Sequence, residues 1–309
     1  MKVLILGAAG QVGSELGPAL QRTSHDHGGH GVEIVTKTRD TLDVTDFDAV
    51  SQTLSDLKPS WVINATAYTA VDRAESEPDL ADLLNSTVPH QLAKLCQAQA
   101  ARLIHISTDY VFPGQGDLPF DETAVTEPLG VYGKTKLRGE QAIRDALPAH
   151  IILRTSWVFG ERGTNFVKTM LRLAGSRNQI SVVADQIGAP TSARSIAETI
   201  ASIVFAMQGA EETDTRWGTY HYSGYPFCSW SGFAQEIFAQ ALELGLMTAA
   251  PQVHSITTEE YPTPAKRPHN SRLDCGKLRT IFEVEPDEWK VSLTAVLTGL
   301  KSAEGKCEF

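Results

Sequence analysis

A tyrosine and a lysine, Tyr132 and Lys136, stand four residues apart in a run that has the composition of a helix. Side chains at this spacing lie on one face of a helix. A free tyrosine has a pKa of about 10, which is too high for proton transfer at neutral pH. A neighbouring ammonium and the positive charge of an oxidised nicotinamide both favour the phenolate and lower that pKa. The pair therefore indicates a proton-donating tyrosine assisted by a lysine, although ordinary exposed helix starts also show this spacing.

Three hydroxyl side chains and a carboxylate follow directly on an apolar run that we interpret as a buried strand. They are Ser107, Thr108, Asp109 and Tyr110. Ligands of open parallel sheets bind beyond the carboxyl ends of the strands, so the Thr108 hydroxyl would hydrogen-bond a substrate oxygen beside Tyr132. The alternative is a turn in which these side chains bond the local backbone. We favour catalysis for Thr108, because two further motifs accompany it, and assign no chemical role to Ser107 and Tyr110.

The segment GAAGQVG carries three glycines, Gly7, Gly10 and Gly13, between an expected strand and an expected helix. Glycine lets the backbone turn tightly and approach a ligand closely. The helix that follows offers unpaired N–H groups and the positive end of its dipole, which suit a pyrophosphate. In this position the spacing predicts a dinucleotide-binding loop rather than a purely structural turn.

The end of the second expected strand bears on which dinucleotide is bound. An acidic residue there commonly holds a ribose 2′-hydroxyl, but no such acid is evident, and Lys37 and Arg39 occupy this region. Two cations suit a 2′-phosphate, so the sequence favours NADP(H) over NAD(H). Two solvated surface cations are the alternative.

Two other strand ends are expected to reach the same crevice. Ala67, Tyr68 and Thr69 follow the third strand and would pass along the cofactor. Trp157 ends the last core strand, where its indole would either cover a sugar or ring or stay buried in the core.

Two arginines, Arg267 and Arg272, lie in a proline-stiffened segment of an acidic protein. Arginine side chains suit a diphosphate, so both are candidate substrate ligands. Solvated surface cations are again the alternative.

Short apolar strands alternate with helical segments over the first half of the chain and position these residues. Strands are expected at 3–6, 31–38, 61–67, 103–107 and 150–159, and helices at 47–57, 78–100 and 132–146. Such alternation implies right-handed β-α-β units and a Rossmann-type, doubly wound α/β fold. Pro89 should kink the helix at 78–100 or mark its true start. Beyond residue 160 we expect helices at 165–174, 192–207 and 231–245 and a strand at 219–223.

The 309 residues exceed what one compact domain usually needs. We therefore expect a nucleotide-binding domain of residues 1–156 plus about 191–225. A smaller substrate domain would comprise about 157–190 plus 226–309.

Composition and charge exclude several classes of protein. The formal net charge of −10 argues against a general nucleic-acid or anionic-membrane surface. The cysteines show no CxxC spacing that would predict a disulfide framework or a zinc site; they are Cys96, Cys228, Cys275 and Cys307. The first apolar run is too short for a signal peptide, and no stretch is long enough to span a membrane, so we expect a soluble, cytoplasmic protein. We interpret the histidine-rich stretch 25–31 as an exposed loop rather than a metal site.

Taken in order, several segments resemble the dTDP-4-dehydrorhamnose reductases of the extended short-chain dehydrogenase/reductase superfamily. They are GAAGQVG, INATAYTAVDRAE, STDYVFPG, YGKTK, RTSWVFG, NFVKTML, DQIGAPT and RPHNSRLD, and they span nearly the whole chain. The glycine loop and YxxxK alone identify only the superfamily, whereas STDYVFPG, SWVFG and DQIGAPT are specific to this branch. The resemblance implies NADPH-dependent, often NADH-tolerant, reduction of the C4 ketone of dTDP-4-dehydro-L-rhamnose to dTDP-L-rhamnose.

The resemblance also implies a role for individual residues. Tyr132 would donate the proton to the C4 oxygen, and Lys136 would bind the nicotinamide ribose and lower the tyrosine pKa. Thr108 would hydrogen-bond the reacting oxygen, with Asp109 beside it at the sugar and Trp157 packed on the deoxysugar. The implied cofactor contacts are Gly10, Gln11 and Val12 at the pyrophosphate, Asp43 and Val44 at the adenine end, and Ala67–Thr69 in the middle.

One departure from the family concerns the homodimer, which some members form through a magnesium ion held by acidic side chains. Glu15 fits one such ligand, but Arg194 stands where a second is expected. A cation there disfavours a metal site, so a magnesium-bridged dimer is not expected.

Two other functions stay open. One is a nucleotide-sugar 4-epimerase, against which SWVFG and DQIGAPT argue. The other is a non-catalytic regulatory subunit, of which the intact Thr108, Tyr132 and Lys136 give no sign.

Overall fold

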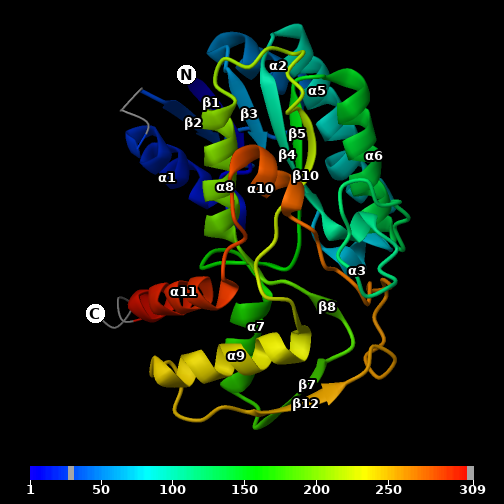
Figure 1. The fold of residues 1–309 in the computed structure, drawn as a ribbon, viewed down its shortest axis with the longest axis vertical. Coiled ribbons are helices and arrows are strands. Elements are labelled where there is room, and N and C mark those ends of the chain that lie inside the picture. Colours follow the sequence, from blue (N-terminus) through cyan, green and yellow to red (C-terminus); the bar gives the residue numbers. More distant parts are fainter. Residues whose placement is uncertain (27–30, 305–309) are drawn as a thin grey trace.

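The computed structural model describes residues 1–26 and 31–304. Cys307 and most of the histidine-rich stretch at 25–31 lie outside these residues. Figure 1 shows a larger upper part built around one sheet and a smaller lower part formed mainly by later segments of the chain.

Six strands form one parallel sheet in the order β10-β5-β4-β3-β1-β2. They are β1 (Lys2–Leu6), β2 (Glu33–Lys37), β3 (Trp61–Asn64), β4 (Arg102–Thr108), β5 (His150–Thr155) and β10 (Gly218–His221). The order reverses beside β1, which lies between β2 and β3. In such sheets the ligand crevice lies outside the carboxyl ends of the strands at this reversal.

Helices cover both faces of the sheet, as the alternating sequence pattern predicts (Figure 1). On one face, α1 (Gln11–Asp26) packs against α8 (Ala193–Ala206), and both share a fully buried core with β1. On the other face lie α2 (Phe47–Leu57), α5 (Val88–Ala98) and α6 (Val131–Ala146). The predicted doubly wound α/β class is therefore confirmed.

The expected helix at 78–100 is interrupted. Its pieces are α4 (Pro78–Asp82), a single wide π turn (Leu83–Thr87) and α5, which follows the short α3 (Val71–Ala74). Pro89 lies in the first turn of α5, directly after the wide turn, so the helix changes its hydrogen-bonding pattern where the proline lacks an N–H. The wide turn touches α6 so closely that a Cβ on Gly139 would lie 2.1 Å from the carbonyl oxygen of Asn85.

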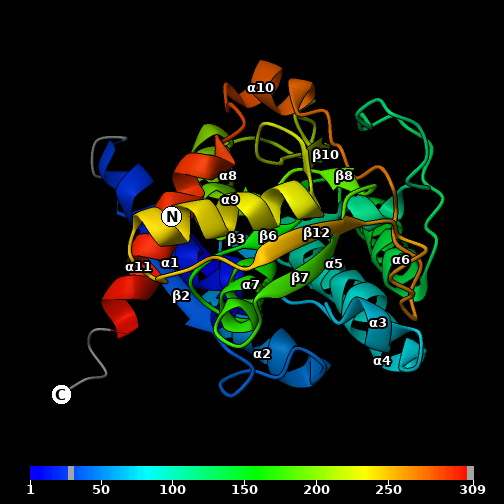
Figure 2. The same cartoon turned by 90° about the horizontal axis from the view of Figure 1, so that it is seen from below.

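The smaller part has its own core. Its helices are α7 (Phe166–Ala174), α9 (Trp230–Glu243) and α11 (Trp289–Glu304), and β7 (Gln179–Val183) pairs in parallel with β12 (Gln252–Ile256). Phe159, Val167, Phe233 and Trp289 are buried together among these elements. Figure 2 shows β7 and β12 side by side with α7 and α9 next to them.

Short two-residue pairs connect the two parts. They are β6 (Val158–Phe159) with β9 (Thr191–Ser192), and β8 (Ile187–Gly188) with β11 (Cys228–Ser229). The chain then returns to the larger part at α10 (Gly276–Phe282), whose Leu278 and Phe282 belong to the core around α1 and α8.

The expected strand at 150–159 is two strands, β5 and β6. Trp157 between them has a φ of +47°, a left-handed conformation that ends regular strand geometry. The side chain of the residue before it, Ser156, donates to the carbonyl of Ala189 at 3.1 Å and so ties the break to the smaller part. Among the residues that the structure describes, no helix is long and apolar enough to cross a membrane.

Candidate active site

The glycine loop lies at the carboxyl end of β1, where a ligand of the sheet is expected. Gly7 has a φ of +80°, and a Cβ on it would lie 2.8 Å from the carbonyl oxygen of Ala65. A Cβ on Gly13 would lie 2.1 Å from the carbonyl oxygen of Gly7, so both glycines are required by the turn itself. Gly10 is exposed at the tip, and α1 begins at the next residue. The loop therefore leaves room for a phosphate before the first N–H groups of α1, which lack intrahelical partners.

Gln11 and Val12 open α1, and Gln11 is fixed from the smaller part. The Asn165 side chain donates to Gln11 Oε1 at 2.9 Å and to the carbonyl of Gly160 at 2.8 Å. The carboxamide of Asn165 also caps α7. Because one side chain bonds the nucleotide loop and starts a helix of the smaller part, it couples the two sides of the crevice.

Lys37 and Arg39, the two candidate ligands of a 2′-phosphate, lie at the end of β2 and just after it. The carbonyl of Lys37, the last residue of β2, accepts from the N–H groups of Gly7 and Ala8 at 3.0 Å each, while Arg39 is exposed. Asp43 lies close by, and the N–H and hydroxyl of Thr45 donate to its carboxylate, which lowers its pKa together with a smaller effect of Arg39. Val44 is partly buried. The backbone of Lys37 therefore contacts the glycine loop, and the charge of Arg39 acts on Asp43.

The segment after β3 is held away from solvent by hydrogen bonds. The N–H of Tyr68 donates to Asn85 Oδ1 at 2.9 Å, and its hydroxyl donates to Glu77 at 2.6 Å, a bond that raises the pKa of the phenol. Ala67 is partly buried and Thr69 is exposed beside it. The hydroxyl of Tyr68 is therefore already engaged, so this residue offers a cofactor only its backbone and ring surface.

Thr108 and Tyr132 face each other at the end of β4. The Thr108 hydroxyl donates to Asp109 Oδ1 at 3.1 Å and accepts from the N–H of Tyr110 at 3.2 Å, so it caps the turn that ends the strand. Burial raises the pKa of Tyr132, a hydrogen bond with Thr108 opposes this, and the charge of Asp109 adds to it. The ring of Tyr110 packs edge-on against Tyr132, with centroids 5.5 Å apart. The sequence-predicted hydroxyl pair is therefore assembled.

Lys136 lies one helical turn after Tyr132 and is buried. Its Nζ donates to the carbonyl of Ile106 at 2.7 Å and lies 3.0 Å from His105 Nε2. Burial lowers the pKa of Lys136 to about 8, and the charge of Glu140 counters the shift. The ammonium thus contacts β4 rather than the phenol, and the expected lowering of the tyrosine pKa is not present in the protein alone.

Asp109 is a buried carboxylate at the centre of the site. Burial raises its pKa to about 6, against the effect of hydrogen bonds from Ser271 and Thr108. Its second oxygen, Oδ2, is buried and has no hydrogen-bond partner among the described residues. A free acceptor beside two hydroxyls suits a substrate that offers a hydroxyl of its own.

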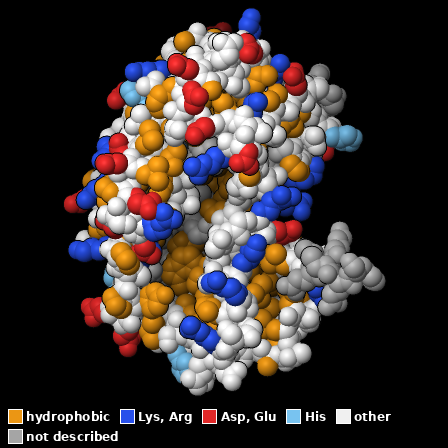
Figure 3. Space-filling view, turned by 180° about the vertical axis from the view of Figure 1, so that it is seen from behind, with side chains coloured by type: hydrophobic (Ala, Val, Ile, Leu, Met, Phe, Trp, Pro, Cys, Tyr) orange, Lys and Arg blue, Asp and Glu red, His pale blue; other side chains and the backbone are white. Residues whose placement is uncertain are grey.

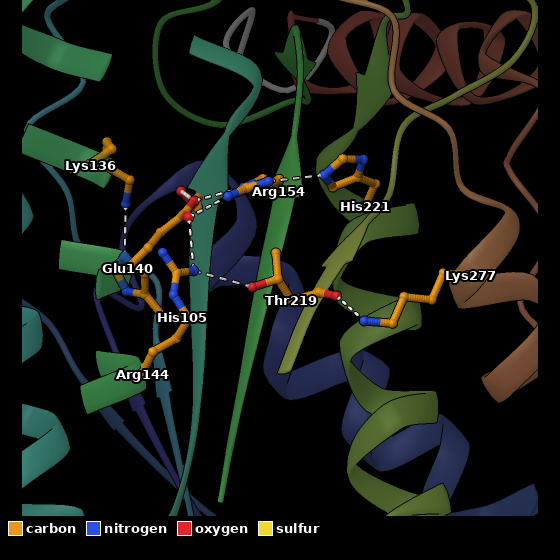
Figure 4. Close-up of polar contacts among 9 residues, drawn as sticks. His105, Lys136, Glu140, Arg144, Arg154, Thr219, His221 and Lys277 are labelled. Carbon is orange, nitrogen blue, oxygen red and sulfur yellow. Dashed lines mark hydrogen bonds and ion pairs between the residues drawn. The ribbon is translucent and has the colours of Figure 1, made fainter. Parts of the chain in front are cut away.

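A buried ion pair supports α6 behind the site, and Figure 4 shows Glu140 of α6 joined to Arg154 of β5, which also contacts His221 of β10. Arg154 donates to both oxygens of Glu140, at 2.9 Å and 2.6 Å, and the Ser107 hydroxyl adds a third bond at 2.6 Å. Arg144 bonds the same carboxylate at 3.2 Å. Ser107, which we expected only to position its neighbours, thus anchors α6 to the strand that carries Thr108.

The expected substrate arginines separate. Arg267 donates to Asp72 at 2.6 Å, and its charge lowers the pKa of Tyr110, the ring that packs against Tyr132. A cleft beside it is lined by residues from the segments 113–115 and 258–269. Arg272 donates to Asn270 at 3.0 Å, and within residues 1–26 and 31–304 no hydrogen bond or ion pair joins its side chain to Tyr132 or Thr108. Figure 3 shows a hollow in one face of the molecule with Lys and Arg side chains around it.

Trp157 stands between the two parts. Its ring stacks on Trp230 with centroids 3.6 Å apart, and a Cβ on Gly188 would lie 2.8 Å from it. The indole is partly buried and packs against the core of the smaller part. This packing favours a structural role for at least one face of the ring.

Glu15 is partly buried on α1 and its charge acts on Arg194. The guanidinium of Arg194 donates to Glu198 at 2.9 Å, and Arg22 pairs with the same carboxylate at 3.0 Å. Across the described ranges, no three His, Cys, Asp or Glu side chains are grouped as a metal site.

Sequence reasoning missed four buried polar residues, which lie in β3, in β4, in the wide turn before α5 and in the loop before α10. Asn64, His105 and Asn85 are fully buried, and Ser271 is nearly so. A polar residue within a run such as RLIHIS or WVIN is a usable signal, because a buried polar group requires a partner. The partners themselves come from the sheet register, which the sequence does not reveal.

Comparisons with known proteins show the family of the chain. The family model described as the RmlD substrate binding domain matches residues 1–302. A dTDP-4-dehydrorhamnose reductase of Salmonella typhimurium is 41% identical over 299 residues, covering 96% of this chain and 97% of that protein. A solved Clostridium acetobutylicum dTDP-4-dehydrorhamnose reductase is 37% identical with a TM-score of 0.86, covering 97% of this chain and all 100% of that one.

A Bacillus anthracis dTDP-4-dehydrorhamnose reductase, solved in complex with NADP, is 34% identical with a TM-score of 0.86, covering 96% of this chain and 99% of that one. The fold and these relatives define a Rossmann-type oxidoreductase. Within that class, the chain belongs to the dTDP-4-dehydrorhamnose reductase family.

Proposed function

We propose that this protein reduces the C4 ketone of dTDP-4-dehydro-L-rhamnose to dTDP-L-rhamnose with NADPH as the electron donor. The observation that carries the proposal is the meeting of Thr108 and Tyr132 at the end of β4, with Lys136 one turn further along α6. Membership of the reductase family supplies the substrate class, and the NADP complex of the Bacillus anthracis relative supports the cofactor.

The chemistry of the chain's own residues is general acid catalysis. When bound, the reduced nicotinamide supplies the hydride that C4 accepts. As charge develops on the C4 oxygen, the Tyr132 hydroxyl gives it a proton and the Thr108 hydroxyl donates a hydrogen bond to it. Asp109, which has a free buried oxygen, holds a neighbouring hydroxyl of the sugar and so fixes which carbon faces the tyrosine.

The raised pKa of Tyr132 fits a proton donor, since the phenol stays protonated until the reacting oxygen needs the proton. Lys136, one turn along the same face of α6, is the residue that would return a proton to the phenolate.

The arrangement of the two parts suggests how the ligands are divided. The sheet with residues 1–156 and about 191–225 would hold NADPH at the glycine loop, with Lys37 and Arg39 at the 2′-phosphate. Residues about 157–190 and 226–309 would hold the dTDP-sugar, with Arg267 toward the diphosphate.

A direct assay of NADPH oxidation tests the proposal. Purified protein should oxidise NADPH only when dTDP-4-dehydrorhamnose is added, with one NADPH consumed per sugar reduced. Tyr132→Phe should lower kcat by about 10²–10⁴-fold while NADPH still binds. A 4-epimerase would interconvert sugars without net NADPH oxidation, and a wild-type protein that binds NADPH but reduces nothing would exclude the enzyme altogether.

A further inference from the structure

Three polar side chains form a chain through the buried interface between the sheet and α6. Asn64 on β3 and His105 on β4 are partners in the parallel register, and both are fully buried. Asn64 Nδ2 lies 3.0 Å from His105 Nδ1, and His105 Nε2 lies 3.0 Å from Lys136 Nζ. The close-up in Figure 4 shows the last of these contacts joining the strand to the helix.

The orientation of Asn64 is fixed by its other bonds. Its Oδ1 accepts from the N–H of Thr66 at 3.0 Å and from the Thr66 hydroxyl at 2.6 Å. A backbone N–H can only donate, so the atom that receives it must be the amide oxygen. The atom facing His105 is therefore the amide nitrogen, which is a donor only.

That donor determines the tautomer of His105. Because Asn64 Nδ2 donates to Nδ1, this ring nitrogen must carry no proton. Burial lowers the pKa of His105 well below its usual value, and the charge of Lys136 adds to the shift, so the ring is neutral. A neutral imidazole with an unprotonated Nδ1 carries its proton on Nε2, and it therefore points a donor at Lys136.

Lys136 completes the chain in only one of its two charge states. An uncharged amine has two N–H donors and one lone pair. One donor serves the carbonyl of Ile106, the lone pair accepts from His105, and the second donor is left for a ligand. An ammonium has no lone pair, so charging Lys136 sets a donor against a donor at 3.0 Å unless the whole chain is reversed.

The charges around the pair do not cancel this preference. Glu140, one turn beyond Lys136, is the nearest group that favours the ammonium. Its carboxylate accepts hydrogen bonds from Arg154, Arg144 and the Ser107 hydroxyl. The attraction of its negative charge is therefore shared between these groups and the lysine. Arg154 also contacts His221 at 3.4 Å, which closes the network on the β10 side.

On the other side of Lys136 lie Tyr132, one turn earlier on α6, and Asp109 at the end of β4. The phenol is held protonated by burial, and the Asp109 carboxyl bonds Thr108 and Ser271. From β3 and β4 the neutral groups Asn64 and His105 face the amine directly.

We propose that Asn64 and His105 act as positioning residues that hold Lys136 in a hydrogen-bond arrangement fitted to its uncharged amine, so that the lysine exchanges protons in the neutral pH range. This role rests on the proposed function: after Tyr132 has given its proton to the substrate, Lys136 is the group that returns a proton to it. The amine takes a proton from solvent to become an ammonium, which the direction of the Asn64–His105 chain disfavours. The ammonium then gives that proton to the phenolate of Tyr132 and returns to the uncharged amine.

Asn64→Asp is the sharpest variant, because it replaces one donor by an acceptor of the same shape. The new carboxylate still accepts from Thr66, but it now accepts from Nδ1–H of His105. Nε2 then becomes an acceptor, and the chain fits the ammonium instead. Burial lowers the pKa of wild-type Lys136 to about 8, and we expect Asn64→Asp to raise it by about one pH unit or more.

The measurement is the pH titration of the lysine ε-methylene signals in protein labelled with ¹³C-lysine, without cofactor or substrate. Lys136→Arg identifies the Lys136 signal by its loss. Asn85→Asp is the matched control, because it adds a carboxylate at a fully buried asparagine whose amide bonds Tyr68 and Thr135 rather than His105. An equal rise in Asn85→Asp would assign the effect to charge alone and overturn the proposal.

A second measurement needs no variant. The ¹⁵N shifts of the wild-type His105 ring should show a neutral tautomer with its proton on Nε2. A proton on Nδ1, or a Lys136 that titrates with the surface lysines, would contradict the proposal. Both readouts use the free protein, so they stand if the sugar assay fails, and a working reductase with an ordinary Lys136 would sink only the positioning role.

Discussion

Thr108 lies close enough to Tyr132, across the gap between β4 and α6, to lower the pKa of the phenol against the effect of burial. The backbone N–H of Tyr110 holds Thr108 in place from behind, and the Tyr110 ring packs edge-on against the phenol. The two side chains that would meet the reacting oxygen are therefore positioned before any ligand binds.

Removing the Thr108 hydroxyl should lower kcat more than it raises KM, because the bond to the reacting oxygen strengthens as charge develops there. We expect Thr108→Val to lose about 10²–10³-fold in kcat, the usual effect of one oxyanion donor. Thr108→Ser keeps the hydroxyl and should retain most of the activity. Steady-state kinetics with dTDP-4-dehydrorhamnose separates the outcomes, and a fully active Thr108→Val would remove Thr108 from the catalytic set.

The Asp109 carboxyl should make stability depend on pH. Its folded-state pKa of about 6 is above the usual value of about 3.9, so the folded protein binds more protons between these values. This contribution to the free energy of unfolding is complete below about pH 4 and is lost as the pH rises through about 6. Relative to wild type, Asp109→Asn should gain up to about 3 kcal/mol between pH 4 and pH 8.

Urea denaturation at several pH values measures that gain. Asp121→Asn is the control with the opposite sign, because hydrogen bonds from Thr123 lower the pKa of Asp121. A pH-independent difference between wild type and Asp109→Asn would show that the carboxyl titrates normally. Asp109→Asn should also bind the sugar more weakly, since a neutral amide replaces the free acceptor.

The sequence predicted the larger part of the fold well, and the reason is physical. Strands and helices that bury a periodic apolar face are readable from local pattern alone, and α2 was predicted with its observed bounds, 47–57. By contrast, β7 and β12 were missed because β12 is largely exposed and the two strands pair over some seventy residues of chain. Local periodicity carries no record of such a pairing.

The residues of the candidate site likewise divide into those that the sequence predicts and those that only the folded structure brings together. Thr108, Tyr132 and Lys136 follow from residue type, spacing and the rule about strand ends. His105 and Asn64 could not be connected to them, because the contact depends on the register that places these two residues side by side on β3 and β4. Arg267 and Arg272 looked equivalent in sequence, and only the folded loop brings Arg267 to Tyr110.

The ion pair behind α6 should matter for stability rather than chemistry. Glu140→Leu leaves the Arg154 guanidinium buried without its counter-charge, which typically costs about 3–5 kcal/mol of the free energy of unfolding. The double variant Glu140→Leu/Arg154→Met removes both charges and should recover most of that loss. Denaturation midpoints of the four proteins in this cycle test the coupling, and additive losses would show that the pair is not coupled.

Cofactor preference should respond to the two cations beside the glycine loop. Without their charge a 2′-phosphate loses its partners, whereas a 2′-hydroxyl loses nothing, so Lys37→Ala/Arg39→Ala should raise KM for NADPH about tenfold and leave KM for NADH nearly unchanged. Lys94→Ala, which removes an exposed charge from α5, is the control. Equal changes for both cofactors would mean that the cations do not contact the 2′ position.

Substitutions at two glycines of the loop should distinguish an effect on folding from an effect on cofactor binding. A Cβ on Gly13 would lie 2.1 Å from the carbonyl oxygen of Gly7, so Gly13→Ala must displace the loop or α1 and lower the denaturation midpoint. A Cβ on the exposed Gly10 meets only that same oxygen, at 3.2 Å, which the fold can absorb. If a pyrophosphate packs on Gly10, then Gly10→Ala should keep the wild-type midpoint and lose NADPH affinity, as measured by calorimetry. Undiminished NADPH binding by Gly10→Ala would place the pyrophosphate elsewhere.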